Sequence, residues 1–302
     1  MDMKKTAIVT GGTKNQFPAM AVLALNIADK CHDIADEIIF FHDGISKTEQ
    51  EKVKTIFPSR FIEYKSPFED LNGFSITITN YFSLMVFCKY ECWKLLKEYK
   101  TIIWIDYDML FLTDISELTI KNNNYCRFIN DHLLIKKFNS SLFWEYESDA
   151  IKLPLYINGI CACLFVLHDD FPNYLDFYQS CIEKTVKFCK ALYLPEEAII
   201  SLLFDEYNIK YDEIDSSIYA LQPQKESISE FTKGIHSCGQ PKFWNGLNNN
   251  QWNAYYKIWL EKYNGEPFSN SCSKKISFKK IVKCILPYGI IRLYQRHKKH
   301  GK

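Results

Sequence analysis

Two aspartates separated by a single residue, Asp106 and Asp108, follow an apolar run and are the strongest chemical signal in the sequence. In an extended strand, residues i and i+2 share a face, so both carboxylates could reach one point. Two carboxylates at the carboxyl edge of a sheet can hold a divalent cation, with diphosphate oxygens as its further ligands. A solvated turn after an edge strand accounts for the tripeptide equally well, so both interpretations stay open at this point.

A second candidate segment begins at His236 and ends at Trp244. An imidazole could add a ligand to a carboxylate-bound metal and would favour manganese over magnesium. Gly239 would let the backbone approach a phosphate closely, and Lys242 would supply a point charge to it. Taken alone, a His followed by a Lys more often has no role in binding a metal or a phosphate.

The elements that must position these residues alternate between strand and helix. The predicted strands are 6–10, 37–41, 60–64, 101–105 and 156–167. The predicted helices are 18–30, 46–56, 79–99, 174–190, 195–204 and one that begins at 248–250. In the last of these, aromatic residues recur at helical spacing, which indicates core packing. Strands separated by helices predict a parallel α/β sheet whose ligands bind at the carboxyl ends of the strands, where Asp106 and Asp108 lie.

Together these segments resemble glycosyltransferase family 8, which includes glycogenin and the bacterial lipopolysaccharide glucosyl- and galactosyltransferases. Residues 99–110 resemble the family's strand with its Asp-x-Asp motif, and 236–244 fit every fixed position of His-x-x-Gly-x-x-Lys-x-Trp. Residues 89–93 resemble the segment whose basic residue contacts the donor. Residues 157–159 resemble the Asn-x-Gly turn without its middle residue, and 41–46 resemble the second strand and the start of its helix. The resemblance covers about residues 6–250 in the right order.

The resemblance implies a GT-A fold with a mainly parallel central sheet, a UDP-sugar donor, Mn²⁺ (or Mg²⁺) and retention of anomeric configuration. The implied metal ligands are Asp106, Asp108 and His236. The implied donor-binding residues are Thr10, Gly11, Lys89, Asp106, Tyr107, Asn158, Gly239 and Lys242. A metal and a lysine would stabilise the negative charge that develops on the departing diphosphate.

The sequence departs from the family's pattern at two places. Thr10 and Gly11 lie in the first nucleotide loop, where the family usually carries an Asp, so the resemblance does not extend to recognition of the base. Glu196 and Glu197 stand where the family often has Asp and Gln beside the donor sugar, and Asp131 matches another acidic residue near it. We predict catalytic roles for these three acids, with Glu197 stabilising the oxocarbenium face or acting as a nucleophile. Alternatively, Glu196 and Glu197 are simply a favourable first turn of a helix.

Two other functions are compatible with parts of the sequence. Residues 7–14 and the Tyr90-x-x-x-Lys94 spacing resemble a short-chain NAD(P)-dependent dehydrogenase, but Asn15 and Phe17 stand where its glycine fingerprint needs glycine. A non-catalytic glycan-binding relative would keep the fold and tolerate loss of the metal ligands, all three of which are present. We therefore favour a hexosyltransferase acting on a lipopolysaccharide or other surface-polysaccharide acceptor.

Composition bounds the location and the partners. The 302 residues include 37 Lys and Arg and 36 Asp and Glu, and no run is long enough to span a membrane. Ten of the basic residues and no acidic residue lie in 274–302, so the remainder is acidic, which argues against nucleic-acid binding. The apolar run near the N-terminus is too short for a signal peptide, and the eleven cysteines are expected to be reduced thiols in the cytoplasm.

The C-terminal segment is predicted to bind membranes. Residues 278–286 place apolar side chains on one face of a helix and lysines on the other, which is typical of an interfacial helix. A helix docked on the acidic domain is the alternative. We expect a nucleotide-sugar-binding half (1–120), an acceptor-binding half (121–272) and a basic tail (273–302) that holds the enzyme at the anionic inner face of the cytoplasmic membrane, near a lipid-linked glycan acceptor.

Overall fold

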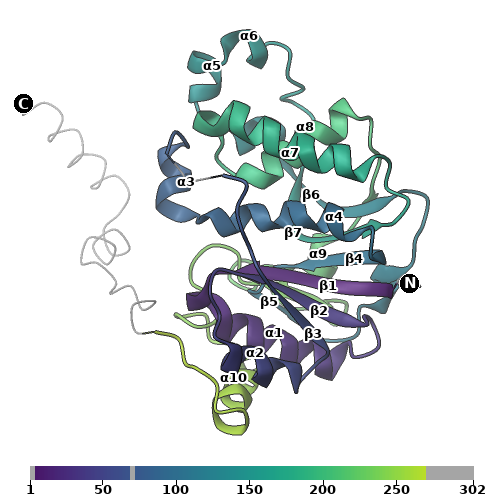
Figure 1. Cartoon of the computed structure of the whole chain (residues 1–302), viewed down its shortest axis with the longest axis vertical. Coiled ribbons are helices and arrows are strands. Elements are labelled where there is room, and N and C mark those ends of the chain that lie inside the picture. Colours follow the sequence, from purple (N-terminus) through teal and green to yellow (C-terminus); the bar gives the residue numbers. More distant parts are fainter. Residues whose placement is uncertain (1–3, 69–71, 270–302) are drawn as a thin grey trace, which may run out of the picture. The chain divides into compact units, whose positions relative to one another are not determined.

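A seven-stranded sheet forms the centre of the computed structural model, which describes residues 4–68 and 72–269 (Figure 1). The strand order is β3-β2-β1-β4-β7-β6-β8. The strands are β1 (Lys4–Gly12), β2 (Glu37–His42), β3 (Ser59–Glu63), β4 (Tyr99–Ile105), β6 (Cys126–Leu133), β7 (Asn158–His168) and β8 (Asp212–Glu213). β1 to β4 are parallel, and β7 runs antiparallel to both β4 and β6. The mainly parallel sheet predicted from the sequence is confirmed.

Helices cover both faces of this sheet (Figure 1). The α-helices are α1 (Phe17–Lys30), α2 (Lys47–Lys54), α3 (Ile76–Tyr81), α4 (Glu91–Leu95), α5 (Ser141–Glu145), α6 (Glu147–Ala150), α7 (Tyr174–Phe188), α8 (Pro195–Glu206), α9 (Ser216–Tyr219) and α10 (Asn250–Lys262). The 3₁₀ helices are η1 (Lys14–Gln16), η2 (Leu84–Tyr90), η3 (Ser116–Thr119), η4 (Leu134–Lys137) and η5 (Cys189–Ala191). α1, α2 and α10 lie on one side, and α4, α7 and α8 lie on the other.

Aromatic side chains fill the core on the α4–α7–α8 side. Phe165 of β7 stacks on Phe128 of β6 with ring centroids 4.8 Å apart, and on Trp104 of β4 at 6.1 Å. On the opposite side, the aromatic stripe of α10 buries Trp252 and Trp259, as its helical spacing predicts. Such stacked and edge-on pairs fix the β4–β7–β6 part of the sheet, which carries most of the candidate site.

The single helix predicted at 79–99 is wrong. The segment is α3, then η2, then α4, because Phe82 adopts an extended backbone and ends α3. The Ser83 hydroxyl accepts a hydrogen bond from the Met85 N–H and so starts the next turn. β-branched Ile76 and Ile78 weaken α3 as a helix, and a serine that can cap favours a new start. The break places Lys89 near the end of η2.

The short strands β5 (Met109–Phe111) and β9 (Gly234–His236) pair antiparallel in a separate two-stranded sheet. The chain divides into two compact units, Met1–Pro267 and Phe268–Lys302, and every element named above belongs to the first. The predicted interfacial helix at 278–286 lies outside the described residues. Among the described helices, none has the length and apolarity needed to cross a bilayer.

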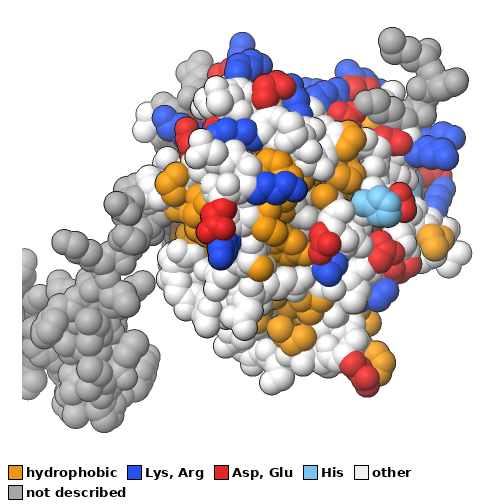
Figure 2. Space-filling model, turned by 90° about the horizontal axis from the view of Figure 1, so that it is seen from below, with side chains coloured by type: hydrophobic (Ala, Val, Ile, Leu, Met, Phe, Trp, Pro, Cys, Tyr) orange, Lys and Arg blue, Asp and Glu red, His pale blue; other side chains and the backbone are white. Residues whose placement is uncertain are grey.

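The surface of this unit carries charges of both signs. On the face shown in Figure 2, Lys and Arg side chains lie among Asp and Glu, with hydrophobic side chains exposed between them. Within 4–68 and 72–269 the nine cysteines are free thiols, and Cys161 and Cys163 lie on one face of β7, as their spacing predicts.

Candidate active site

The Asp-x-Asp turn and the His236 segment meet at the carboxyl edge of the sheet. Asp106 directly follows β4, and the chain turns at once into β5. β5 pairs with β9 so that Met109 lies opposite His236, and the Ser237 N–H donates to the Asp108 carbonyl at 3.0 Å. This ladder joins two segments that are far apart in the sequence.

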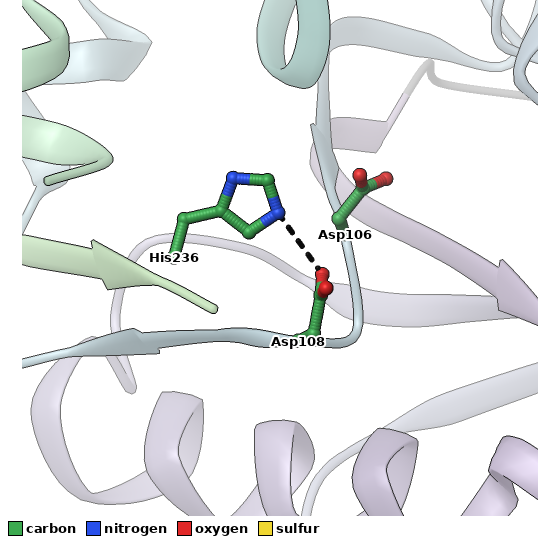
Figure 3. A group of neighbouring side chains, drawn as sticks. All are labelled: Asp106, Asp108 and His236. Atoms are coloured by element: carbon green, nitrogen blue, oxygen red, sulfur yellow. Dashed lines mark ion pairs between the residues drawn. The ribbon is translucent and has the colours of Figure 1, made fainter. Parts of the chain in front are cut away.

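The three predicted metal ligands lie close together. One ligand atom each from Asp106, Asp108 and His236 falls within 4.8 Å of the other two. Figure 3 shows the imidazole of His236 facing the carboxylate of Asp108, with Asp106 beside them. The His236 Nε2 lies 3.2 Å from Asp108 Oδ1, and the Lys242 ammonium pairs with Asp108 Oδ2. Two carboxylates and one imidazole are a donor set that suits Mn²⁺, so these residues fit the metal that the sequence predicts.

Asp108 is buried, although a carboxylate that follows the end of a strand would ordinarily lie at the surface. Burial raises the pKa of a carboxyl group, but the charges of His236 and Lys242 outweigh it and hold the pKa of Asp108 well below its usual range. In return, Asp108 raises the pKa of His236 to about 9 against the effect of burial. In this structure two cations thus neutralise the carboxylate that a metal would bind.

A second charged cluster centres on Lys89 of η2, a predicted donor-binding residue. Its buried Nζ lies 2.8 Å from Glu196 Oε1 and 3.2 Å from Asp106 Oδ1. The Trp104 indole N–H also donates to Asp106 Oδ1, at 2.7 Å. Burial lowers the pKa of Lys89, but the two carboxylates raise it well above the ordinary value, so the lysine stays charged. Lys89 and Trp104 therefore both contact the same oxygen of Asp106, and Glu196 reaches Lys89 from the first turn of α8.

A third cluster joins the remaining predicted acids through a lysine that sequence reasoning missed. The Lys137 Nζ lies 2.7 Å from Asp131 Oδ2 and 2.7 Å from Glu197 Oε2. The Ala162 N–H donates to the other oxygen of Glu197, at 3.1 Å. In the sequence, Lys137 is one of two adjacent lysines and carries no signal that sets it apart. Asp131 and Glu197 are thus brought together, and adjacent Glu196 and Glu197 link this cluster to that of Lys89.

The first-strand residues lie close to the Asp-x-Asp turn. A side chain at Gly11 would meet the Cys88 Sγ at 2.5 Å, so only glycine fits there. A Cβ at Gly12 would lie 3.2 Å from the Tyr107 ring, which places Tyr107 over the end of β1. Thr10 is buried, and its hydroxyl has no hydrogen-bond partner among the described residues.

The two remaining predicted donor-binding residues lie at exposed or open positions. Asn158 begins β7 opposite Leu133 of β6, and its side chain is exposed. Gly239 has a φ of +73°, which favours glycine, and a Cβ there would have no heavy atom within 4 Å. The space beside the Gly239 Cα is therefore open.

The fold matches that of the GT-A glycosyltransferases. It resembles the galactosyltransferase LgtC solved with donor and acceptor sugar analogs (TM-score 0.64, 14% identity, 83% of this chain and 95% of that chain). It also resembles an active-site mutant of LgtC (0.63, 16%, 86% and 99%) and the bifunctional glycosyltransferase WbbM (0.60, 13%, 86% and 51%). At these identities the likeness concerns the fold.

The family follows from the sequence. A model of the family described as glycosyl transferase family 8 matches residues 7–248, and the chain therefore belongs to that family. The resemblance drawn from the motifs is confirmed, and the protein is a glycosyltransferase. No curated protein sequence matches the chain.

The dehydrogenase alternative is not favoured. Tyr90 is buried in η2 and its hydroxyl bonds to Thr185, whereas Lys94 pairs with Glu91 at 2.7 Å. The two residues are therefore engaged in separate packing contacts. The glycan-binding alternative is not favoured either, since the charged clusters at the strand edge are complete.

Proposed function

We propose that this protein is a metal-dependent, retaining glycosyltransferase that moves a hexose from a UDP-sugar to a surface-polysaccharide or lipopolysaccharide acceptor. The observation that carries the proposal is the convergence of Asp106, Asp108 and His236 beside Lys242. When bound there, Mn²⁺ or Mg²⁺ would neutralise negative charge on the donor's diphosphate.

The chain's own residues supply the rest of the proposed chemistry. Lys242 leaves Asp108 and turns its ammonium to the departing diphosphate, where the backbone at Gly239 also has room to approach. Because the charge on the leaving group grows toward the transition state, such a contact raises the rate more than the affinity. Lys89 holds Asp106 and Glu196 in place, as its two ion pairs support. We propose that Tyr107, Thr10 and Gly11 border the nucleotide.

The donor sugar is proposed to lie against Glu196, Glu197 and Asp131. A carboxylate beside the anomeric carbon stabilises the positive charge of an oxocarbenium-like transition state. Both Glu197 oxygens accept hydrogen bonds from the protein, which supports an electrostatic role for this residue. We place Asn158 at the outer edge of the same site.

The decisive experiment is a screen of nucleotide sugars for hydrolysis with and without Mn²⁺. We expect saturable, Mn²⁺-dependent release of UDP from one UDP-sugar, and loss of this activity in EDTA. Asp108→Asn should remove it, whereas Asp114→Asn, at an exposed position after β5, should keep it. Full activity in excess chelator would contradict the metal assignment. The anomeric configuration of the product, read by NMR, tests retention.

The acceptor and the location remain part of the proposal. The positive charge of residues 274–302 supports the proposal that the protein binds an anionic membrane surface. The proposed acceptor is a lipid-linked glycan on the cytoplasmic side of that membrane. Co-sedimentation with anionic and with neutral vesicles tests the surface. Transfer to lipid-linked glycans extracted from a bacterial envelope tests the acceptor.

A further inference from the structure

Lys137 is a fully buried lysine to which the proposed mechanism gives no role. Lysines are almost never fully buried unless they are paired, and this one pairs with two acids, Asp131 of β6 and Glu197 of α8. Its backbone carbonyl also accepts hydrogen bonds from the N–H groups of Tyr193 and Leu194, which immediately precede α8. Lys137 therefore fixes the start of α8 through both its main chain and its side chain.

The strand beside Lys137 leaves room for its side chain. A Cβ at Gly159 of β7 would lie 2.4 Å from Lys137 Cε and 2.9 Å from the His132 carbonyl oxygen. No side chain larger than hydrogen fits there without moving the lysine or the backbone. The Lys137 side chain therefore packs against Gly159, and its ammonium contacts the two acids from the protein interior.

Because its side chain has no exposed surface, Lys137 cannot touch a substrate that enters from solvent. Its effect on a bound sugar must pass through the acids that it holds. Asp131 and Glu197 are both partly exposed, with side-chain accessibilities of 26% and 12%. The acids can therefore face a ligand while the lysine lies behind them.

We propose that Lys137 is a positioning residue of the donor-sugar site, which holds the carboxylates of Asp131 and Glu197 in fixed orientation from behind. This inference rests on the proposed role of these two acids beside the donor. A single cation between two carboxylates offsets the electrostatic repulsion between them.

The electrostatics of Asp131 agree with this arrangement. Burial raises the pKa of its carboxyl group, but the hydrogen bond and the charge of Lys137 outweigh burial and lower the pKa overall. The charged and titratable groups that face the pair are Lys137 of η4, His132 of β6, Glu196 of α8, Lys89 of η2, and Cys161 and Cys163 of β7. Of these, only Lys137 is bonded to both acids.

The test replaces Lys137 by methionine, which keeps the length of the side chain and removes the charge. We expect the kcat for donor hydrolysis to fall roughly 10- to 100-fold, by analogy with the loss of a supporting partner at a metal site. UDP affinity should change by less than about twofold, because the lysine does not face the nucleotide. The acidic limb of the kcat profile should move to higher pH, since Asp131 loses the cation that lowers its pKa.

The matched control is Lys184→Met. Lys184 of α7 pairs with Glu206 at the opposite end of α8, at 2.6 Å. This variant loses an ion pair to the same helix and should keep the wild-type kcat and pH profile. Lys137→Met with a wild-type kcat and pH profile, and only a lower unfolding midpoint, would show a purely structural lysine and overturn the inference.

A double-mutant cycle keeps the inference testable even if Lys137→Met is weakly folded. If Lys137 acts through Glu197, then Lys137→Met should lower kcat much less in a Glu197→Gln background than in the wild type. If Lys137→Met lowers kcat by the same factor in the wild type and in the Glu197→Gln background, Lys137 does not act through Glu197.

A readout without catalysis separates this inference from the proposed function. The folded-state pKa of Asp131 is depressed, so the ion pair stabilises the protein above the unfolded pKa and is lost as the pH falls through the folded one. The stability deficit of Lys137→Met should therefore shrink between about pH 7 and about pH 3. An equal deficit at both values would overturn the inference, whereas inactivity of the wild type with every nucleotide sugar would count against the proposed function.

Discussion

Asp108→Asn is the most informative single substitution, because the buried carboxylate is at once a proposed metal ligand and the partner of two cations. Asparagine keeps the shape of the side chain and removes its charge. His236 and Lys242 then lose the group that neutralises them. Alanine would add a cavity to this change, so asparagine isolates the electrostatic part.

The expected cost can be worked out from His236. Asp108 raises its pKa from the ordinary 6.5 to about 9, which corresponds to about 3.5 kcal/mol at about 1.4 kcal/mol per unit. Because the folded-state pKa lies above the unfolded one, this stability is fully present below pH 6.5 and is lost as the pH rises through 9. The Lys242 pair is nearer the surface and contributes roughly 1 kcal/mol at either pH.

The assay is urea unfolding of wild type and Asp108→Asn in EDTA, so that no metal contributes. We expect the variant to be less stable by about 4 to 5 kcal/mol near pH 6 and by about 1 kcal/mol above pH 9. Donor hydrolysis in Mn²⁺ should be lost at every pH. The same stability deficit at both pH values would refute the assignment of the His236–Asp108 ion pair, whatever happened to activity.

Three further substitutions test the rest of the site, and one truncation tests the tail. Lys242→Met should lower kcat roughly 10²- to 10³-fold, as removal of one preorganised donor does; an unchanged kcat with weaker donor binding would make it a uniform binder. Glu197→Gln should slow transfer strongly, because its amide would face the Lys137 ammonium, while Glu196→Gln should mainly disturb donor positioning through Lys89. Wild-type rates in both glutamate variants would leave these residues only as the first turn of α8. Removal of 274–302 should release the protein from anionic vesicles and leave donor hydrolysis intact, and full-length protein should detach as salt rises. Equal pelleting of the truncated and full-length proteins would refute the membrane role of the tail.

The local pattern of the sequence was enough to predict the sheet and the segments that carry the chemistry. The apolar run 101–105 ends at Asp106 because a parallel strand buried on both faces must stop where the chain returns to solvent. The aromatic spacing of α10 predicts its buried face, because helical periodicity can be read from the local sequence. Family membership followed from fixed residues in order, none of which needs a structure to recognise.

Only the tertiary structure decided which charges meet. Asp108 looks like a surface residue in the sequence, and its burial depends on the distant strand β9 that pairs with β5. Lys137 could not be distinguished from its neighbour Lys136 until Gly159 and Glu197 were placed around it. The break at Ser83 arose because a capping hydroxyl and an extended Phe82 outweighed helix propensity. Burial and ion pairing are set by residues far apart in the chain, and local sequence does not specify them.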